Sequence, residues 1–473
     1  MVGRLYSSRI AGSKLVFLDV VQDGNRVQGM LNFGKLEASG VSKDEFKKFY
    51  HVARRGDIVG KQLKEAQQPL ALTTITEVTG TPMRTSRGEL SVNGLSLPTI
   101  LTPTIATMPL TLEDAETRAK ARHADMLVNP HVVDTLRLRS HIIQFLRNFL
   151  VKDDFLEVQT PIIAEEAGGA AARPFNTFAT EFSDKKLSLR IAPELWLKRL
   201  ILGGMDRVFE IGPSFRNEGL DATHNPEFTT CEFYKSFANL DELMFMTESL
   251  LCGLAGHVNE LNTAKSSSLK SVEVPAPPFQ RIEFVPALEK AIGRTLPDLE
   301  AADAGEKLMA IYADLSIKLP DSPTLPRLLD ELASINLEPS CGKPTFIIHH
   351  PACMAPLAKA FVDPTTNQLV SARAELFMQH KEIANMYEEE NSPIEQRRKF
   401  VQQLQWKDAE NEAIVDESYL EALTWGLPPT GGWGCGIDRL CMMMSGATRI
   451  SDVQTFGSLK HVVGYGNGQQ KKK

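Results

Sequence analysis

The feature that most constrains this chain is a pair of strand-like runs separated by a polar loop at about residues 217–225. Gly219, His224 and the Asn225-Pro226 step are turn-forming, so an antiparallel hairpin is expected. Because side chains alternate between the faces of a strand, one face would project the side chains of Arg216, Glu218, Phe228, Glu232 and Tyr234. Such a face is too polar for a core and suits a ligand, although a solvated surface is the alternative.

A second polar run extends from Glu375 to Glu389. Glu375 and Glu382 bring two carboxylates, and Asn385 begins a segment with polar groups at alternate positions. Carboxylate oxygens are ligands that Mg²⁺ prefers, and an arginine fork suits phosphate oxygens. Taken alone, this run is more typical of a salt-bridged surface. Together with the hairpin, it indicates a site for a metal and a phosphorylated ligand.

A glycine-rich strand leads into a helical pattern between Gly426 and Met444. Glycine lets a ligand approach the backbone closely, and Arg439 would lie in the first turns of the following helix, where it could face phosphates. The run Met442-Met-Met444 is more typical of core filling. No GxxxxGK[ST] or GxGxxG motif indicates another nucleotide-binding fold.

The periodicity of the chain divides it into two parts. Short alternating strands and one amphipathic helical pattern at 43–50 occupy the first hundred residues, which suits a small barrel ending in a Thr/Pro-rich linker. Helical periodicity begins at Thr111, which we expect to be an N-cap. The Leu- and Ala-rich segment at about 290–340 reads as a helical insertion, and the end of the chain reads as a disordered tail.

Composition excludes several classes of function. No apolar run approaches 18 residues, so no membrane span is expected. The six cysteines form no CxxC pair, which gives a zinc site or disulfide framework little support. The net charge of −7 means that any nucleic-acid binding must use local patches. Strand-like sequence follows Met1 directly, which suggests that residues upstream are missing.

These segments resemble the three motifs of class II aminoacyl-tRNA synthetases. The helix and strand that end at Pro161 resemble motif 1, Phe215-Arg-Asn-Glu218 resembles motif 2, and Gly434-Cys-Gly-Ile-Asp-Arg439 resembles motif 3. Four further sequence segments resemble the lysyl-tRNA synthetase family in particular: Gly168–Phe175, Arg190–Leu195, His224–Tyr234 and Gly426–Thr430. The resemblance covers roughly residues 1–460.

The resemblance implies an α+β protein. Residues 1–105 would form a five-stranded OB barrel that binds the anticodon. Residues 106–462, including the insertion, would form the class II catalytic domain, an antiparallel sheet flanked by helices, and 463–473 the tail. It also implies a homodimer built on motif 1. OB barrels stack single-stranded bases on aromatic rings, and the family's anticodon-reading positions fall here on Phe17, Gln28 and Glu89. For Phe17, a place in the core is an equal alternative.

The resemblance also implies that ATP and L-lysine are substrates, that Mg²⁺ is a cofactor and that tRNA(Lys) is a partner. By this resemblance, Arg216 would hold the lysine carboxylate and the α-phosphate of ATP. Arg439 would bind the γ-phosphate and contact the adenine. The remaining ATP contacts would come from Glu218, His224 and Phe228, and Mg²⁺ would bind Glu375 and Glu382. Lysine would be held by Gly169, Glu194, Glu232, Tyr234, Asn385, Tyr387 and Glu389.

Three other readings stay open. A sister enzyme for aspartate or asparagine shares the fold but should present basic or amide groups in place of Glu389. An enzyme that lysylates a protein lacks the OB barrel, and an inactive tRNA-binding module would not need Arg216 and Arg439. The segment Leu187–Arg199 resembles fungal mitochondrial forms of the family more than cytosolic forms. We therefore expect the protein to act in the mitochondrial matrix, with the cytoplasm as the alternative.

Overall fold

The computed structural model describes residues 2–22, 24–52, 75–102, 109, 111–165, 168–169, 172–265, 271–406 and 415–464. The chain divides into two compact units, residues 1–130 and 131–473. The predicted tail at 463–473 lies outside the described residues, apart from its first two positions. No helix in the part of the chain that the structure describes is long and apolar enough to cross a bilayer.

The N-terminal unit contains one sheet with the strand order β5-β6-β3-β2-β1-β4-β7. Its strands are β1 (Val2–Ala11), β2 (Leu15–Gln22), β3 (Asn25–Asn32), β4 (Ile75–Glu77), β5 (Gly80–Arg84), β6 (Leu90–Gly94) and β7 (Thr99–Thr102). The OB-like sheet is confirmed, with β3 and β6 parallel. Within the described residues the sheet has seven strands, because the short β4 and β7 extend the predicted OB-like sheet beyond β1.

Alternation along β2 and β3 separates a core face from a polar face. Val16, Leu18, Val20 and Leu31 are buried in the core together with Phe46 of helix α2 (Lys43–Val52). Helix α1 (Phe33–Ala38) covers the same face, with Asn32 as its N-cap. The opposite face is therefore the one available to a ligand.

Two short helices, α3 (Ala115–Lys120) and α4 (Arg122–Val128), complete this unit. The prediction that Thr111 caps the first helix was wrong. Asp114 is the N-cap, because its carboxylate accepts a hydrogen bond from the Thr117 N–H at 2.8 Å. A carboxylate at this position also interacts favourably with the helix dipole.

The C-terminal unit is built on an eight-stranded sheet with the order β14-β15-β18-β19-β20-β13-β12-β8. Its strands are β8 (Leu156–Glu157), β12 (Arg207–Phe215), β13 (Glu227–Ser236), β14 (Gln280–Glu283), β15 (Thr345–Ile348), β18 (Arg373–Met378), β19 (Lys381–Glu388) and β20 (Thr430–Gly436). Pairing is antiparallel except at the two edges, β14–β15 and β12–β8. The predicted hairpin is confirmed as β12–β13, with a loop at 216–226.

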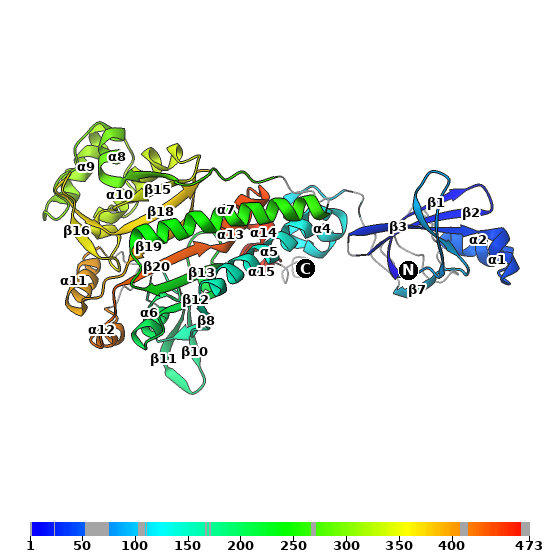
Figure 1. Ribbon diagram of the computed structural model, residues 1–473, viewed down its shortest axis with the longest axis horizontal. Helices are drawn as coiled ribbons and strands as arrows, with labels where there is room; N and C mark the ends of the chain where they lie inside the picture. Colours follow the sequence, from blue (N-terminus) through cyan, green and yellow to red (C-terminus); the bar gives the residue numbers. More distant parts are fainter. Residues whose placement is uncertain are drawn as a thin grey trace, which may run out of the picture. The chain divides into compact units, whose positions relative to one another are not determined.

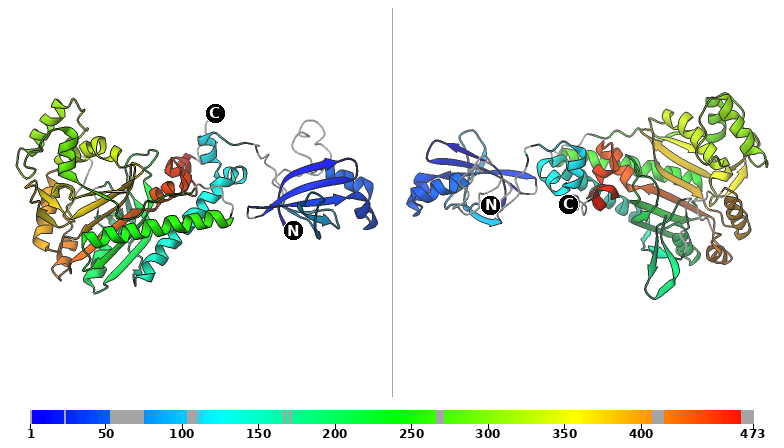
Figure 2. Two further views of the ribbon diagram at one scale, coloured as in Figure 1. Left: turned by 45° about the horizontal axis from the view of Figure 1, so that its top comes forward. Right: turned by 180° about the vertical axis from the view of Figure 1, so that it is seen from behind.

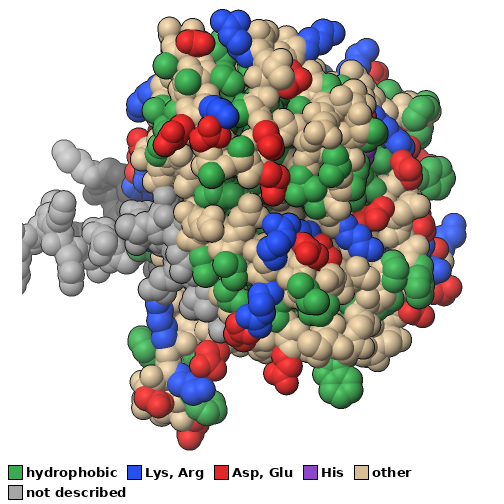
Figure 3. Space-filling model, turned by 90° about the vertical axis from the view of Figure 1, so that its left-hand side faces the viewer, with side chains coloured by type: hydrophobic (Ala, Val, Ile, Leu, Met, Phe, Trp, Pro, Cys, Tyr) green, Lys and Arg blue, Asp and Glu red, His purple; other side chains and the backbone are tan. Residues whose placement is uncertain are grey.

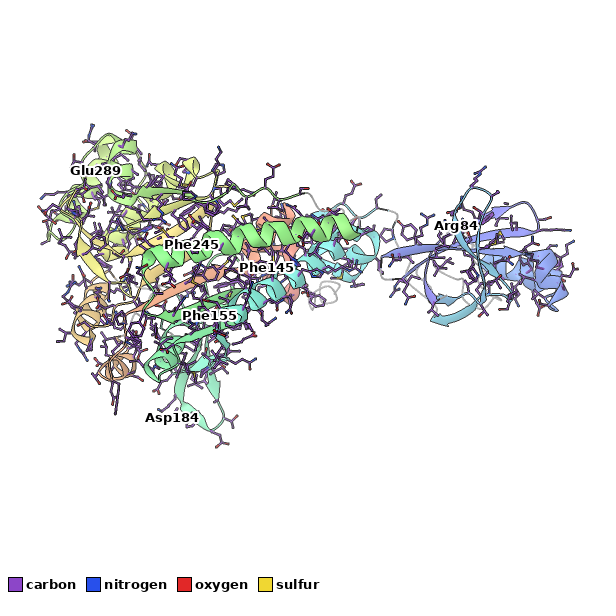
Figure 4. All side chains as sticks on the ribbon, viewed as in Figure 1. Arg84, Phe145, Phe155, Asp184, Phe245 and Glu289 are labelled. Carbon is purple, nitrogen blue, oxygen red and sulfur yellow. The ribbon has the colours of Figure 1, made fainter. Side chains whose placement is uncertain are left out.

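Three helices cover one face of this sheet (Figures 1 and 2). They are α5 (Pro130–Lys152), α7 (Leu240–Lys265) and α13 (Ile437–Ser445). Phe155, labelled in Figure 4, packs its ring 5.1 Å from that of Phe233, which stacks 4.9 Å from Trp433. Met442–Met444 are buried in the same core, so the core-filling prediction is confirmed.

The predicted helical insertion is confirmed as α8 (Phe284–Ile292), α9 (Ala304–Asp314) and α10 (Leu325–Asn336), which share a separate apolar core. The face of the molecule shown in Figure 3 carries acidic, basic and apolar side chains intermixed. The remaining elements are η1 (Glu338–Ser340), η2 (Ala352–Met354), β9 (Ile163–Ala164), β10 (Asn176–Ala179), β11 (Phe182–Leu189), β16 (Ala360–Val362), β17 (Leu369–Ser371), α6 (Glu194–Leu202), α11 (Pro393–Leu404), α12 (Glu417–Leu423), α14 (Ile450–Val453) and α15 (Leu459–Gly464).

Candidate active site

The face of the eight-stranded sheet opposite α7 carries polar side chains in two rows across the strands. In the first row Glu375 pairs with Asn385, Asn385 with Gly434, and Gly434 with Glu232. In the second row Tyr387 and Tyr234 flank Gly432. Neither glycine has a side chain, so polar groups from β18, β19 and β13 face one another across β20. We call this strip of the sheet the trough.

A side chain at position 432 would close this trough. A Cβ added to Gly432 would lie 2.0 Å from Glu389 Oε1 and 2.6 Å from Tyr234 Cε1, both far inside van der Waals contact. At Gly434 an added Cβ would meet only Glu232 Cγ, at 3.6 Å. Glycine is thus required at position 432 of β20 because Glu389 and Tyr234 occupy the space that a side chain would need.

One end of the trough is a buried acidic pocket. Glu194 begins α6, Glu389 directly follows β19, and both carboxylates contact the Lys198 ammonium, that of Glu194 at 2.5 Å. The Tyr387 hydroxyl donates to Glu194 Oε2 at 2.8 Å. Gly169 lies above the start of α6 with φ +95°, and a Cβ there would approach Glu194 Cβ to 3.1 Å.

Glu232 lies next to this pocket and is also buried. Burial and the neighbouring Glu194 raise the pKa of Glu232 to about 8, while Arg216 and Arg190 oppose the rise. Its Oε2 accepts a long hydrogen bond, 3.5 Å, from the Tyr234 hydroxyl. A carboxyl with this pKa is mostly protonated at neutral pH and ionises when a cation binds beside it.

Arg216 lies just after β12, at the opposite end of the trough from Glu389. Its guanidinium stands 5.2 Å from the centroid of the Phe228 ring. Among the residues that the structure describes, its buried Nε has no hydrogen-bond partner. Glu218 is exposed in the loop, so it does not project from a strand as predicted, because β12 ends at Phe215. Arg216 is therefore a partly buried donor directed at the site.

Arg439, the third residue of α13, connects the hairpin loop to β19. Its Nη1 donates to Glu382 Oε2 at 3.0 Å, and its Nη2 lies 2.9 Å from His224 Nε2. His224 Nδ1 lies 2.7 Å from Asp221 Oδ2, which orients the imidazole. The predicted position of Arg439 in the first turn of a helix is confirmed.

A β-bulge brings Glu382 to the site face. Leu376 pairs with Ala384, but Phe377 pairs with Glu382, so Ile383 is an extra residue in β19. Without this bulge, strict alternation from Asn385 would turn Glu382 toward the helices, because a one-residue shift moves a side chain to the other face. The bulge thus places Glu382 on the same face as Glu375.

Glu375 is held by an arginine and a histidine. Its carboxylate contacts Arg373 Nη2, and its Oε2 lies 3.1 Å from His350 Nε2. Burial would raise the pKa of Glu375, but Arg373 and His350 lower it to about 2, so the carboxylate is ionised. Arg373 Nε also donates to Asn385 Oδ1 at 3.1 Å. Asn385 is thereby fixed at the centre of the first row.

In the N-terminal unit, the three predicted anticodon residues lie on the polar face of the sheet. Phe17 pairs with Met30 and Gln28 with Asp19, so Phe17 and Gln28 are diagonal neighbours on one face. Gln28 Nε2 donates to Glu89 Oε2 at 3.2 Å. Phe17 is half-buried, lies under the Arg9 guanidinium at 5.8 Å, and is not part of the apolar core.

Four residues that line or support the site were not predicted: Lys198, Tyr419, Arg373 and His350. Lys198 lies four residues after Glu194, a spacing that usually marks an exposed helical ion pair. Tyr419 comes from α12, which carries no motif. Arg373 lies two residues before Glu375, so strand alternation could have indicated its shared face.

Comparisons with known proteins agree with this geometry. Residues 114–460 match the family model of tRNA synthetases class II (D, K and N). The chain is 39% identical to a mitochondrial lysine–tRNA ligase of Schizosaccharomyces pombe, over 97% of this chain and 84% of that protein. It is 38% identical to a probable cytoplasmic lysine–tRNA ligase of Encephalitozoon cuniculi and 36% identical to a lysine–tRNA ligase of Thermosynechococcus vestitus, each over 97% of this chain and 86% of the relative.

The fold, the site and these matches define an aminoacyl-tRNA synthetase of class II, in the group for aspartate, lysine and asparagine. Within this group, relatives similar over almost the whole chain are lysine–tRNA ligases from fungi, microsporidia and bacteria. The chain therefore belongs to the lysine–tRNA ligase family.

Proposed function

We propose that this protein activates L-lysine with ATP, forming lysyl-adenylate and pyrophosphate, and transfers lysine to the 3' terminal adenosine of tRNA(Lys). The observation that carries the proposal is the pairing of a buried acidic pocket with two arginines on one face of the sheet. ATP–pyrophosphate exchange measured with each amino acid tests the first step, and charging of unfractionated tRNA tests the second. Exchange with aspartate or asparagine instead of lysine would contradict the assignment.

Positioning and electrostatic stabilisation account for the chemistry. The lysine carboxylate attacks the α-phosphorus in line, and negative charge builds on the phosphoryl oxygens. Arg216 would donate to these oxygens, and its buried Nε makes no hydrogen bond with any residue that the structure describes. Arg439 and His224 would bind the far phosphates, while Phe228 stacks on the adenine and Glu218 contacts its edge. Because the donors are already oriented, little reorganisation is needed at the moment of reaction.

The carboxylates of Glu375 and Glu382 would hold Mg²⁺. Glu375 is ionised, and both residues share a face with Arg439, so they suit a hard cation next to phosphates. Among the described residues, no group of three or more His, Cys, Asp or Glu side chains could hold a metal ion by itself, so phosphate oxygens and water would complete its shell. The bound ion would neutralise the pyrophosphate leaving group. Exchange that persists after complete chelation would contradict this role.

Lysine would be bound through its two ammonium groups and its carboxylate. In this proposal Gly169, Glu194 and Glu232 bind the α-amino group, Tyr234, Tyr387 and Glu389 bind the side-chain ammonium, and Asn385 contacts the carboxylate. A neutral or acidic amino acid would leave buried carboxylates without a cation, which penalises the wrong substrate strongly.

The raised pKa of Glu232 predicts that lysine binding depends on pH. The empty pocket holds a proton on Glu232 at pH 7, and the substrate ammonium favours the ionised carboxylate. Lysine binding at pH 7 is therefore expected to release about one proton, and affinity to rise as pH approaches about 8. Calorimetry in buffers of different ionisation enthalpy measures this release. Glu232→Gln should abolish it, and equal release by the variant would contradict the assignment.

Anticodon binding is proposed for the polar face of the OB-like sheet, where Phe17 would stack on a base beside Gln28 and Glu89. Phe17→Ala is expected to weaken tRNA binding by about 1–3 kcal/mol while lysine activation stays intact. Phe46→Ala, in the core of the same unit, should instead lower the melting temperature of the protein. If Phe17→Ala destabilised the unit as Phe46→Ala does, Phe17 would be a structural residue.

Assembly as a homodimer is also proposed. Large apolar side chains within and just after motif 1 are exposed: Val151, Leu156, Ile162 and Ile163. Phe178 and Phe182 of the β10–β11 hairpin are exposed as well. Exposed apolar surface commonly marks a protein interface. A monomeric mass in solution at micromolar concentration would contradict the proposal.

We further propose that residues 1–105 and 106–462 are the OB-fold and catalytic domains, and that the protein acts in the mitochondrial matrix. The S. pombe relative is named mitochondrial, whereas the E. cuniculi relative is named cytoplasmic, so the cytoplasm is the alternative. Fluorescent tagging of the full chain in its own cells distinguishes the two compartments.

A further inference from the structure

A lysine of the protein itself occupies the acidic pocket. Lys198 is fully buried, and its Nζ contacts the carboxylates of Glu194 and Glu389. Three tyrosine rings surround this ammonium, with centroids 6.0 Å (Tyr234), 5.7 Å (Tyr387) and 5.9 Å (Tyr419) away. The carboxylates proposed for the two ends of the substrate are therefore bridged by one internal cation.

The bridge involves one oxygen of each carboxylate. Lys198 donates to Glu194 Oε1, and its Nζ contacts Glu389 Oε2. Glu194 Oε2 accepts from the Tyr387 hydroxyl. Glu389 Oε1 lies beside Gly432 and makes no hydrogen bond with any residue that the structure describes. Among the described residues, this oxygen of Glu389 is therefore an acceptor without a donor.

Charge balance agrees with this arrangement. Once Glu232 has released its proton, Glu194, Glu232 and Glu389 supply three carboxylates against the one ammonium of Lys198, so the pocket carries two negative charges. Lysine brings two ammonium groups, and Arg216 is available for its carboxylate. The two ammonium groups of lysine would neutralise this pocket with Lys198 still in place. Without Lys198, the same two groups would face three carboxylates, and one negative charge would remain unpaired.

Lys198 also opposes protonation of Glu389. Burial raises the pKa of Glu389, and the ammonium of Lys198 is the group that counteracts this rise. Burial would lower the pKa of Lys198, but Glu194 and Glu389 hold it above its usual range, so the ammonium stays charged. A buried carboxyl without its cation takes up a proton and can no longer pair with a substrate ammonium.

We propose that Lys198 is a positioning residue of the lysine pocket, a resident counter-ion that bridges Glu194 and Glu389 and remains there when lysine binds. Its contacts with Glu194 and Glu389 hold the two carboxylates in the orientation that the substrate requires. The inference rests on the proposed function, because it assigns Lys198 a role in recognising lysine. It adds a residue that acts through Glu194 and Glu389 without touching the reacting atoms.

Two neutral variants and a matched control test the role. Lys198→Met keeps the volume of the side chain, and Lys198→Gln keeps a hydrogen-bond donor. Lys399→Met is the control, because Lys399 is also a buried lysine paired with a glutamate, Glu390, at 2.5 Å. Exchange is measured with lysine and ATP varied separately, after melting curves have shown which variants are folded.

In both Lys198 variants the KM for lysine is expected to rise at least about 10-fold at pH 7, with the KM for ATP within about twofold of wild type. The rise should shrink toward pH 8.5, because a proton that Glu389 holds more firmly without Lys198 is lost again as the pH increases. The other ionisable groups that face Lys198 are Glu194, Glu232, Tyr234, Tyr387 and Tyr419. Lys399→Met should leave the KM for lysine unchanged.

Three outcomes would overturn the inference. A KM for lysine that is unchanged or lower would mean that Lys198 is dispensable or competes with the substrate. Equal increases for lysine and ATP without pH dependence would indicate a structural role. Unfolding of both Lys198 variants with a folded Lys399→Met control would indicate the same. Absence of lysine-dependent exchange in the wild type would instead contradict the proposed function itself.

Discussion

Arg216→Ala is expected to lower the rate of lysine-dependent ATP–pyrophosphate exchange by about 100-fold or more. Removing one preorganised donor from a charge-stabilising site typically has an effect of this size. Arg216 meets the requirements for such a donor, because its buried Nε has no hydrogen-bond partner in the described part of the chain and its guanidinium is held over Phe228 at 5.2 Å. The lost stabilisation should appear mainly in kcat, since charge on the phosphoryl oxygens develops only in the transition state.

A stacked arginine elsewhere in the same unit serves as the control. Arg199 lies over the Trp196 ring at 4.8 Å and is bonded to Ser418 on α12. Arg199→Ala also removes a guanidinium from an aromatic face, so its exchange rate should remain near that of the wild type. Near-normal exchange by Arg216→Ala, or an equal loss in both variants, would rule out a specific role for Arg216.

The parts of the site that follow strand alternation could be predicted from the sequence. Glu232 and Tyr234 share a face because they are two residues apart in β13, and Arg439 lies where a helix starts after a glycine-rich strand. Glu382 could not be placed in this way. Its orientation depends on the bulge at Ile383, which no local pattern in the sequence marks.

Long-range burial explains most of what the sequence did not reveal. Glu194 and Lys198 have the spacing of an exposed ion pair, and only the packing of α6 under Tyr387 and Tyr419 buries them. In the same way, the extra strands β4 and β7 are too short to give a periodic signal. Thr111 and Asp114 are both acceptable caps, and local geometry decided between them.

Glu389→Gln is expected to cause the largest loss of amino-acid selectivity. The substitution keeps the shape of the side chain but removes the charge that contacts Lys198 and that we propose to pair with the substrate ammonium. Neutralising one partner of a buried, hydrogen-bonded charge pair typically costs about 2–5 kcal/mol. The kcat/KM for lysine should therefore fall by roughly 30-fold to several thousand-fold, while the KM for ATP changes little.

The adjacent residue offers a matched control for this prediction. Glu390 is also buried and also pairs with a buried lysine, Lys399, but that ammonium is bonded to the backbone of Ala358 and not to the pocket. Glu390→Gln should reduce stability as Glu389→Gln does, without the selective loss of lysine activation. If the two variants lost lysine activation equally, destabilisation would explain both results, and the acidic pocket would not be the determinant of lysine recognition.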